Sequence, residues 1–167
     1  MRQIHLLRHA KSSWDDPGLP DRDRPLAERG ERAAETMGVY LKSRQIRPDL
    51  VLCSSALRAR QTLEAIVPSI GDAETGIEDD LYAAEADGLL ERLRRIPDGI
   101  ASVLLIAHNP GMQDLALELA SEGERLERLR QKFPTAALAT LAFDGRWDEL
   151  RAGGATLVGY VIPKELK

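Results

Sequence analysis

Short apolar runs alternate with longer amphipathic stretches along this chain, and this alternation restricts its possible folds more than any other feature. The clearest apolar runs cover residues 3–7, 49–53 and 102–107, a length and composition typical of buried strands. Two further strand-like segments lie at residues 135–143 and 155–162. Helix-like segments lie between these runs or follow them, at residues 26–45, 56–70, 87–96 and 112–120. Prolines mark several of the boundaries, as is usual where helices begin or end.

This order predicts an α/β fold, a three-layer sandwich with a mostly parallel central sheet flanked by helices. Parallel neighbours need a long crossover, and the crossover is usually a helix. The segments at 135–143 and 155–162 are joined through a turn at Asp144 and Gly145, so we expect them to be antiparallel and to close one edge of the sheet. A length of 167 residues suits one compact domain, which we expect to span residues 1–167.

Charge and composition argue against several classes of function. A formal net charge of −4 does not suit a protein that binds the phosphate backbone of nucleic acid through a broad basic surface. No apolar stretch reaches the roughly 18 residues that a membrane-spanning helix needs, and the N-terminal residues are too polar for a signal peptide. The only cysteine is Cys53, which permits no intrachain disulfide. We therefore expect a cytoplasmic protein without nucleic-acid or membrane partners.

Three of the strand-like runs end in side chains that can hold a phosphate group. Arg8 and His9 follow the first run, Ser54 and Arg58 follow the second, and His108 follows the third. Each of these short motifs is weak alone. Because the carboxyl ends of strands in an open α/β sheet form the ligand-binding edge, however, all three groups are expected to face one crevice.

These residue types suit phosphoryl transfer. A neutral imidazole is a good nucleophile near neutral pH, so His9 is the predicted nucleophile. Arginine binds two oxygens with its planar guanidinium and stays charged, which favours Arg8 and Arg58 as phosphate ligands. His108 is expected to donate a hydrogen bond to a phosphoryl oxygen or to act as a cation. Further candidates for binding the phosphate are Arg24 and Ser54.

Three strings of this sequence, LLRHAKSSWDDPGLPDRDRPLAERG, SSALRARQTLEA and VLLIAHNPGM, resemble the histidine phosphatase superfamily, whose fold is that of phosphoglycerate mutase. The resemblance is closest to its SixA-type phosphohistidine phosphatase branch. It implies that His9 is transiently phosphorylated and then hydrolysed by water, with Arg8, Arg58 and His108 in the phosphate pocket. It also implies that Arg24 lies near the phosphate, and that no metal or organic cofactor is needed.

Two features depart from the superfamily pattern. Ala10 stands where glycine is usual, and we expect a modest local change because alanine lacks glycine's freedom at positive φ. No residue clearly matches the acid that protonates the leaving oxygen in larger members, and the candidates are Glu78, Asp79, Asp80 and Glu85. An imidazole leaving group needs less acid assistance than an alkoxide does. The lack of a clear acid therefore favours phosphohistidine in a signalling protein as the substrate.

Other interpretations stay open or are disfavoured. A small phosphorylated metabolite is the alternative substrate, and a non-catalytic phosphate-binding module is the alternative from a different class. A cysteine phosphatase is disfavoured because four residues separate Cys53 from Arg58, where such enzymes have five. A metal enzyme is disfavoured because the chain has only 3 histidines and His5 lies within a predicted strand. Trp14, in the long polar loop at 12–23, marks either a partner surface or an anchor of the loop. The oligomeric state is not predicted.

Overall fold

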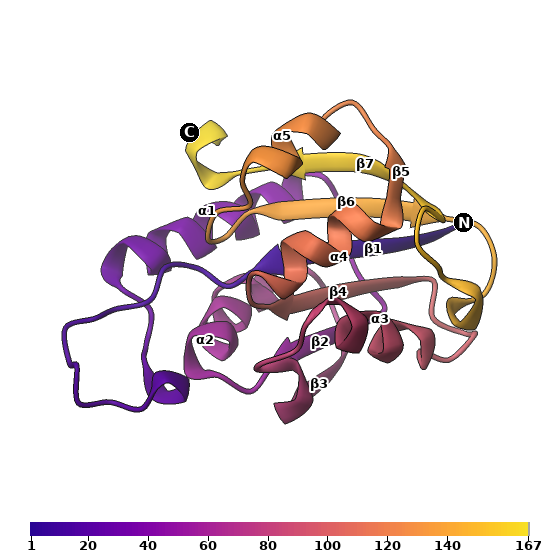
Figure 1. The fold of residues 1–167 in the computed structure, drawn as a ribbon. Helices are drawn as coiled ribbons and strands as arrows, with labels where there is room; N and C mark the ends of the chain where they lie inside the picture. The colour runs from indigo at the N-terminus through magenta and orange to yellow at the C-terminus, as the bar shows by residue number, and fades with distance from the viewer. Residues whose placement is uncertain (167) are drawn as a thin grey trace.

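The computed structural model describes residues 1–166, so Lys167, at the end of the expected domain, lies outside the described residues. Within them, one seven-stranded sheet has the order β3-β2-β4-β1-β6-β7-β5 (Figure 1). The strands are β1 (Arg2–Arg8), β2 (Leu50–Ser54), β3 (Glu74–Glu78), β4 (Ser102–Ala107), β5 (Ala120–Glu122), β6 (Leu138–Phe143) and β7 (Ala155–Val161). The helices are α1 (Glu28–Ser43), α2 (Leu57–Ile66), α3 (Ala86–Arg94), α4 (Gly111–Leu119) and α5 (Leu126–Gln131).

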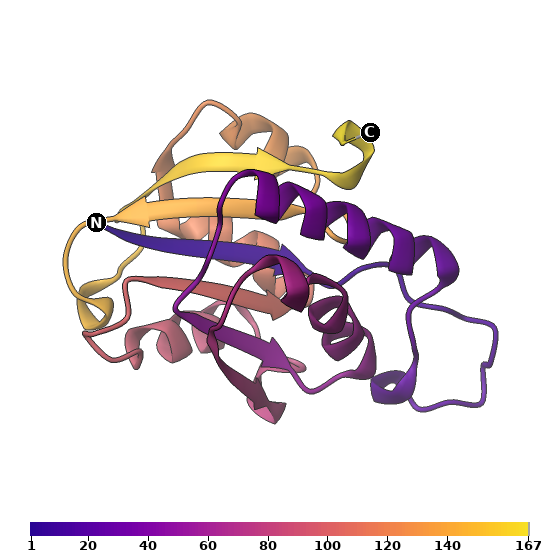
Figure 2. The same cartoon turned by 180° about the vertical axis from the view of Figure 1, so that it is seen from behind.

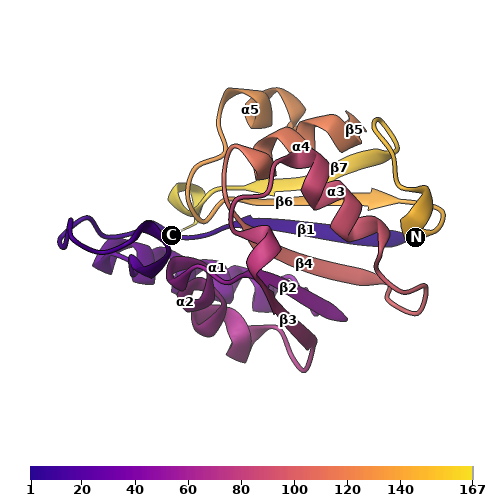
Figure 3. The ribbon, with the colours of Figure 1, turned by 60° about the horizontal axis from the view of Figure 1, so that its bottom comes forward.

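Helices cover both faces of the sheet, as the predicted three-layer sandwich requires (Figure 3). Alternate residues of β4 point to opposite faces. Val103 and Leu105 belong to the apolar cluster that contains α3, α4 and α5. Leu104 and Ile106 belong to the cluster that contains α1 and α2 (Figure 2). None of the described helices is both long enough and apolar enough to cross a lipid bilayer.

The pairing of the strands confirms the mostly parallel α/β fold. Strands β2 and β3, β2 and β4, and β1 and β4 pair in parallel, with α1, α2 and α3 as the intervening crossovers. Strand β6 is antiparallel to both β1 and β7, so the predicted antiparallel orientation of the last two strands is confirmed. Their predicted place at the edge of the sheet is wrong, because β5 pairs with the outer side of β7.

Three of the element boundaries that differ from the prediction have a clear local reason. Helix α1 begins at Glu28 rather than at residue 26, because Leu26 forms an isolated antiparallel bridge with Ser12. Helix α2 ends at Ile66, where the chain tightens into a 3₁₀ turn over Val67–Ser69 that contains a proline. Strand β6 begins only at residue 138, because residues 134–137 form a turn in which Ala136 has a φ of 62°.

The carboxyl ends of β1, β2 and β4 lie side by side. Arg8 is level with Ala107 across the β1–β4 pair, and Cys53 is level with Ile106 across the β2–β4 pair. The chain after β1 leaves this edge as a long loop that projects from the body before it returns to α1 (Figure 1). The fold therefore places the polar residues that follow these three strands next to the base of this projecting loop.

Candidate active site

His9 lies directly after β1 and is buried, with 7% of its surface exposed. Its Nδ1 lies 2.7 Å from the carbonyl oxygen of Ala10. Since a carbonyl can only accept, this contact assigns the ring proton to Nδ1 and the lone pair to Nε2. The pKa of His9 is lowered to about 3, chiefly by burial and also by the nearby His108, Arg58 and Arg8, although the backbone hydrogen bond to Ala10 acts in the opposite direction. At neutral pH His9 is therefore an uncharged imidazole with its lone pair on Nε2.

A buried threonine connects the segment after His9 to helix α2. The backbone N–H of Ala10 donates to Oγ1 of Thr62 at 3.0 Å, and the Thr62 hydroxyl donates to the carbonyl oxygen of Arg58 at 2.8 Å. Among the described residues, the non-glycine positions with positive φ are Gln45 and Ala136. The backbone at Ala10 therefore does not need the positive φ that glycine permits.

Arg8 and Arg58 both lie beside His9 with part of their hydrogen-bonding capacity unused. Arg8 donates from Nη1 to the carbonyl oxygen of Phe133 at 3.0 Å. Within residues 1–166, the buried side-chain atoms without a hydrogen-bond partner are Nε of Arg8, Nε of Arg58 and Nδ1 of His108. Unpaired buried donors are costly, and an anion would satisfy them. These unpaired nitrogens can therefore bind a group with several oxygen acceptors.

His108 is held by Ser54 on the neighbouring strand. Nε2 of His108 lies 2.7 Å from Oγ of Ser54, and the two imidazoles of His9 and His108 are 5.0 Å apart, centroid to centroid. Because Ser54 Oγ accepts the N–H of Ala56 at 3.2 Å, its hydroxyl proton is free for Nε2. When the hydroxyl donates to Nε2, the His108 ring proton lies on Nδ1, which is buried without a partner. Ser54 is fully buried and orients His108, and its predicted contact with phosphate stays a prediction.

Arg24 is buried but already bound by acceptors of its own loop. It donates to Oδ1 of Asp21 from both Nε and Nη2 at 3.2 Å, and from Nη1 to Oγ of Ser12 at 2.8 Å and the carbonyl oxygen of Ser13 at 3.2 Å. Its guanidinium carbon lies 3.6 Å from the centre of the Trp14 ring. Trp14 is 69% exposed, so it does not anchor the loop in the core. Its ring stacks on Arg24 instead.

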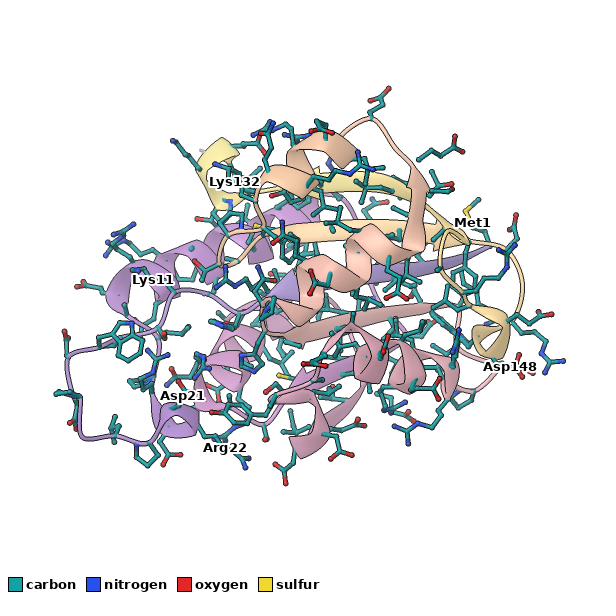
Figure 4. The ribbon with its side chains drawn as sticks, in the orientation of Figure 1. Met1, Lys11, Asp21, Arg22, Lys132 and Asp148 are labelled. Atoms are coloured by element: carbon teal, nitrogen blue, oxygen red, sulfur yellow. The ribbon has the colours of Figure 1, made fainter. Side chains whose placement is uncertain are left out.

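Two residues of the site, Asp21 and Tyr82, do not follow from the sequence pattern. Figure 4 shows Asp21 at the base of the projecting loop, at the end of the molecule opposite Met1. Its carboxylate accepts the Tyr82 hydroxyl and Nη2 of Arg58, and these hydrogen bonds lower its pKa to about 2, with the tyrosine as the largest cause. The Tyr82 ring meets His108 edge-on at 5.6 Å. Neither residue belongs to a run of apolar residues or to a short motif that would have singled it out.

The four candidate acids differ in their surroundings. Glu78 and Asp79 are held by arginines, and hydrogen bonds lower the pKa of both carboxyls. Asp80 lines a separate cavity with Glu78 and Asp79. Only Glu85 of the four shares a cavity of about 550 Å³ with His108. Glu85 is therefore the candidate acid that shares a cavity with the predicted site.

Cys53 and His5, the residues that the cysteine and metal alternatives would use, are both buried in strands of the sheet. Cys53 is fully buried, and burial raises the pKa of its thiol to about 12, so it is not a thiolate nucleophile. His5 is buried in β1, where its Nδ1 lies 3.0 Å from Oγ1 of Thr140. Within residues 1–166, no three His, Cys, Asp or Glu side chains are grouped so that they could hold a metal ion.

Comparison of the sequence with known proteins finds relatives that are histidine phosphatases. A model described as "Histidine phosphatase superfamily (branch 1)" matches residues 4–84. An uncharacterized protein of Mycobacterium tuberculosis is 39% identical over 95% of this chain and 100% of its own length. The phosphohistidine phosphatase SixA of Escherichia coli is 29% identical over 99% of this chain and 96% of its own.

Structural similarity agrees with these matches. The crystal structure of the "putative phosphohistidine phosphatase SixA" from Agrobacterium tumefaciens is 32% identical, with a TM-score of 0.84 over 97% of this chain and 98% of that chain. The match extends over nearly the whole of both chains, so it covers the sheet, the strand ends and the projecting loop together. The chain therefore belongs to the histidine phosphatase superfamily, and it is a phosphatase with the phosphoglycerate mutase-like fold.

Proposed function

We propose that residues 1–167 form a single phosphatase domain that works without a metal ion, through a covalent phosphohistidine on His9. The observation that carries the proposal is the state of the His9 ring: it is uncharged, with its proton on Nδ1 and its lone pair on Nε2. The unpaired buried nitrogens of Arg8, Arg58 and His108 lie around it. A nucleophile and several anion donors in one place support phosphoryl transfer better than phosphate binding alone.

The proposed reaction has two displacements at phosphorus. Nε2 of His9 attacks, a new N–P bond forms, and the bond from phosphorus to the leaving group breaks with its electron pair on the leaving nitrogen, which takes a proton from solvent. Water then attacks the phosphorus on His9 and gives up a proton to solvent, the Nε2–P bond breaks with its electron pair returning to Nε2, and inorganic phosphate leaves. Arg8 and Arg58 stabilise the charge that spreads over the phosphoryl oxygens in both steps.

Phosphohistidine in a protein is the proposed substrate. The carboxyls of Asp21, Glu78 and Asp79 all have lowered pKa values, which makes them poor proton donors at neutral pH. An imidazole leaving group, with a reference pKa of about 6.5, tolerates this better than an alkoxide. The E. coli relative is named as a phosphohistidine phosphatase, which supports the same choice. The proposed compartment is the cytoplasm, in keeping with the free, buried thiol of Cys53.

A small phosphorylated metabolite is the second candidate substrate, and one observation favours it. Glu85 lines the cavity of about 550 Å³ that also contains His108 and Tyr82. This places a carboxyl in the same cavity as His108, and the volume suits a small molecule. The Glu85→Gln variant separates the two candidates, because it removes the acid and keeps the shape of the side chain.

The test is hydrolysis of a phosphohistidine peptide, a phosphoserine peptide and an aryl phosphate, each in excess chelator. Wild type is expected to prefer the phosphohistidine peptide, His9→Ala to lose at least about a thousandfold in turnover, and Glu85→Gln to match wild type. Turnover of phosphoesters alone, with loss in Glu85→Gln, would reassign the substrate to a metabolite. Binding of phosphate without any turnover would support the binding module instead.

A further inference from the structure

The carboxylate of Asp21 binds both Arg24 and Arg58, the two candidate phosphate ligands among the arginines that do not belong to β1. Oδ1 of Asp21 accepts Nε and Nη2 of Arg24 at 3.2 Å. Oδ2 accepts Nη2 of Arg58 at 3.0 Å and the hydroxyl of Tyr82. The backbone carbonyl oxygen of Asp21 accepts Nη1 of Arg58 at 2.7 Å. A single loop residue thus connects its own loop, helix α2 and the segment that follows β3.

These contacts fix the orientation of the Arg58 guanidinium. A guanidinium is a rigid planar fork, so fixing both terminal nitrogens also fixes the direction of Nε. Asp21 binds both terminal nitrogens of Arg58, and the Nε that is left is one of the buried donors without a partner. Arg58 is 6% exposed, so solvent has little part in holding it. The acceptors on Asp21 therefore set the plane in which Arg58 meets the phosphoryl group.

Asp21 is itself held on several sides. Its pKa of about 2, which the Tyr82 hydrogen bond lowers most, keeps the carboxyl ionised at any neutral assay pH. The next residue, Arg22, donates to Oγ of Ser55 at 2.6 Å and to Oδ1 of Asp79 at 2.7 Å. Its guanidinium carbon lies 5.2 Å from the centre of the Tyr82 ring. Figure 4 shows Asp21 and Arg22 together at the base of the projecting loop.

We propose that Asp21 is a positioning residue, which holds Arg58 and Arg24 in the orientation that the transferred phosphoryl group requires, and that Tyr82 holds Asp21. This inference rests on the proposed function, because it assigns Arg58 to the phosphoryl group. The opposite role for the same carboxylate is that of an internal anion which competes with phosphate for the two arginines. The two roles predict changes of opposite sign when the charge of Asp21 is removed.

The test measures kcat and KM on the phosphohistidine peptide, and the affinity for tungstate, in Asp21→Asn, Tyr82→Phe and wild type. If Asp21 positions the arginines, Asp21→Asn is expected to lower kcat by about tenfold or more and to weaken tungstate binding. A competing internal anion would have the opposite effect, because its removal would leave the arginines free to bind tungstate more tightly. Tyr82→Phe is expected to cause a smaller loss of the same kind. Asp23→Asn, in the same 3₁₀ turn and exposed, is the matched control and is expected to behave as wild type.

A double-mutant cycle shows whether Asp21 acts through Arg58. In an Arg58→Ala background, Asp21→Asn is expected to add little further loss, and thermal melting of each variant confirms that it is folded. Full additivity of the two losses would overturn the inference, as would tighter tungstate binding or unchanged kcat in Asp21→Asn. The proposed function fails separately, if wild type has no turnover or His9→Ala keeps it, and tungstate affinity then still tests the role of Asp21.

Discussion

At the level of single residues, the protonation of His9 determines whether this chain has a nucleophile. The hydrogen bond from Nδ1 to Ala10 leaves the lone pair on Nε2, and burial keeps the ring uncharged. His108 is in a similar state, with Ser54 on one nitrogen and the other nitrogen unpaired. Burial keeps both rings uncharged. For His9 this leaves the lone pair of Nε2 available, as a neighbouring base does for a serine or cysteine nucleophile.

The protonation of these rings predicts an unusual titration in the free protein. The pKa of His9 is lowered to about 3 and that of His108 to about 4, in both cases chiefly by burial. Each ring should therefore stay neutral as the pH falls from 7 to 5, where a free imidazole would become mostly protonated. Nitrogen-15 chemical shifts of the histidine side chains measure this directly. A midpoint near 6.5 for His9 would contradict the description of the nucleophile.

The sequence predicts which residues lie at the centre of the site, but it does not predict the residues that contact them. His9, Ser54 and His108 follow apolar runs, and any parallel pairing of those runs brings their carboxyl ends to one edge. Asp21 and Thr62 were not predicted, because their contacts depend on the path of a loop and on one turn of a helix. Neither feature has a periodic signal. The catalytic roles of the predicted residues are proposals that the experiments above test.

At the level of elements, the strands that were predicted are those with apolar residues on both faces. Strand β4 is buried along almost its whole length, whereas β3 and β5 lie at the two edges of the sheet and are largely exposed. An edge strand is short and polar because its outer side faces water. The sequences ETGIE and ASE therefore lack the apolar pattern of a strand, although both segments pair in the sheet.

Two glycines test how α4 is packed against the segment that carries Tyr82. A Cβ at Gly111, the first residue of α4, would lie 2.4 Å from the carbonyl oxygen of Ala84. Gly111→Ala is therefore expected to lower the free energy of unfolding by about 1–3 kcal/mol and to slow turnover, because it separates α4 from that segment.

The matched control is Gly88→Ala, in helix α3. Its added Cβ would lie 3.7 Å from Cβ of Ala84, which is an ordinary contact, and helix propensity then favours alanine by up to about 1 kcal/mol. Denaturant unfolding and phosphatase assays on both variants measure the two effects. Equal stability of the two variants would show that the close approach of α4 to residue 84 is wrong.

At the level of the whole molecule, a chain with a net charge of −4 gathers arginines at one edge of its sheet. The crossovers through α1, α2 and α3 align the three strand ends, and the loop after β1 projects from this end of the sheet (Figure 1). This loop adds Asp21, which binds Arg58, and Arg24, which Asp21 also binds. Local placement of cations, rather than total charge, is what holds a single phosphoryl group. The same arrangement puts His9, the proposed nucleophile, at the end of β1, between its parallel neighbour β4 and its antiparallel neighbour β6.

The most direct test of the central claim is to trap phosphorylated His9. Wild-type protein is mixed with a phosphohistidine peptide labelled in its phosphoryl group, stopped within milliseconds in alkali, digested, and mapped by mass spectrometry. One labelled site is expected, on the peptide that contains His9, with the label lost as inorganic phosphate appears and absent from His9→Ala. Label on any other residue, or turnover by His9→Ala at the wild-type rate, would contradict it.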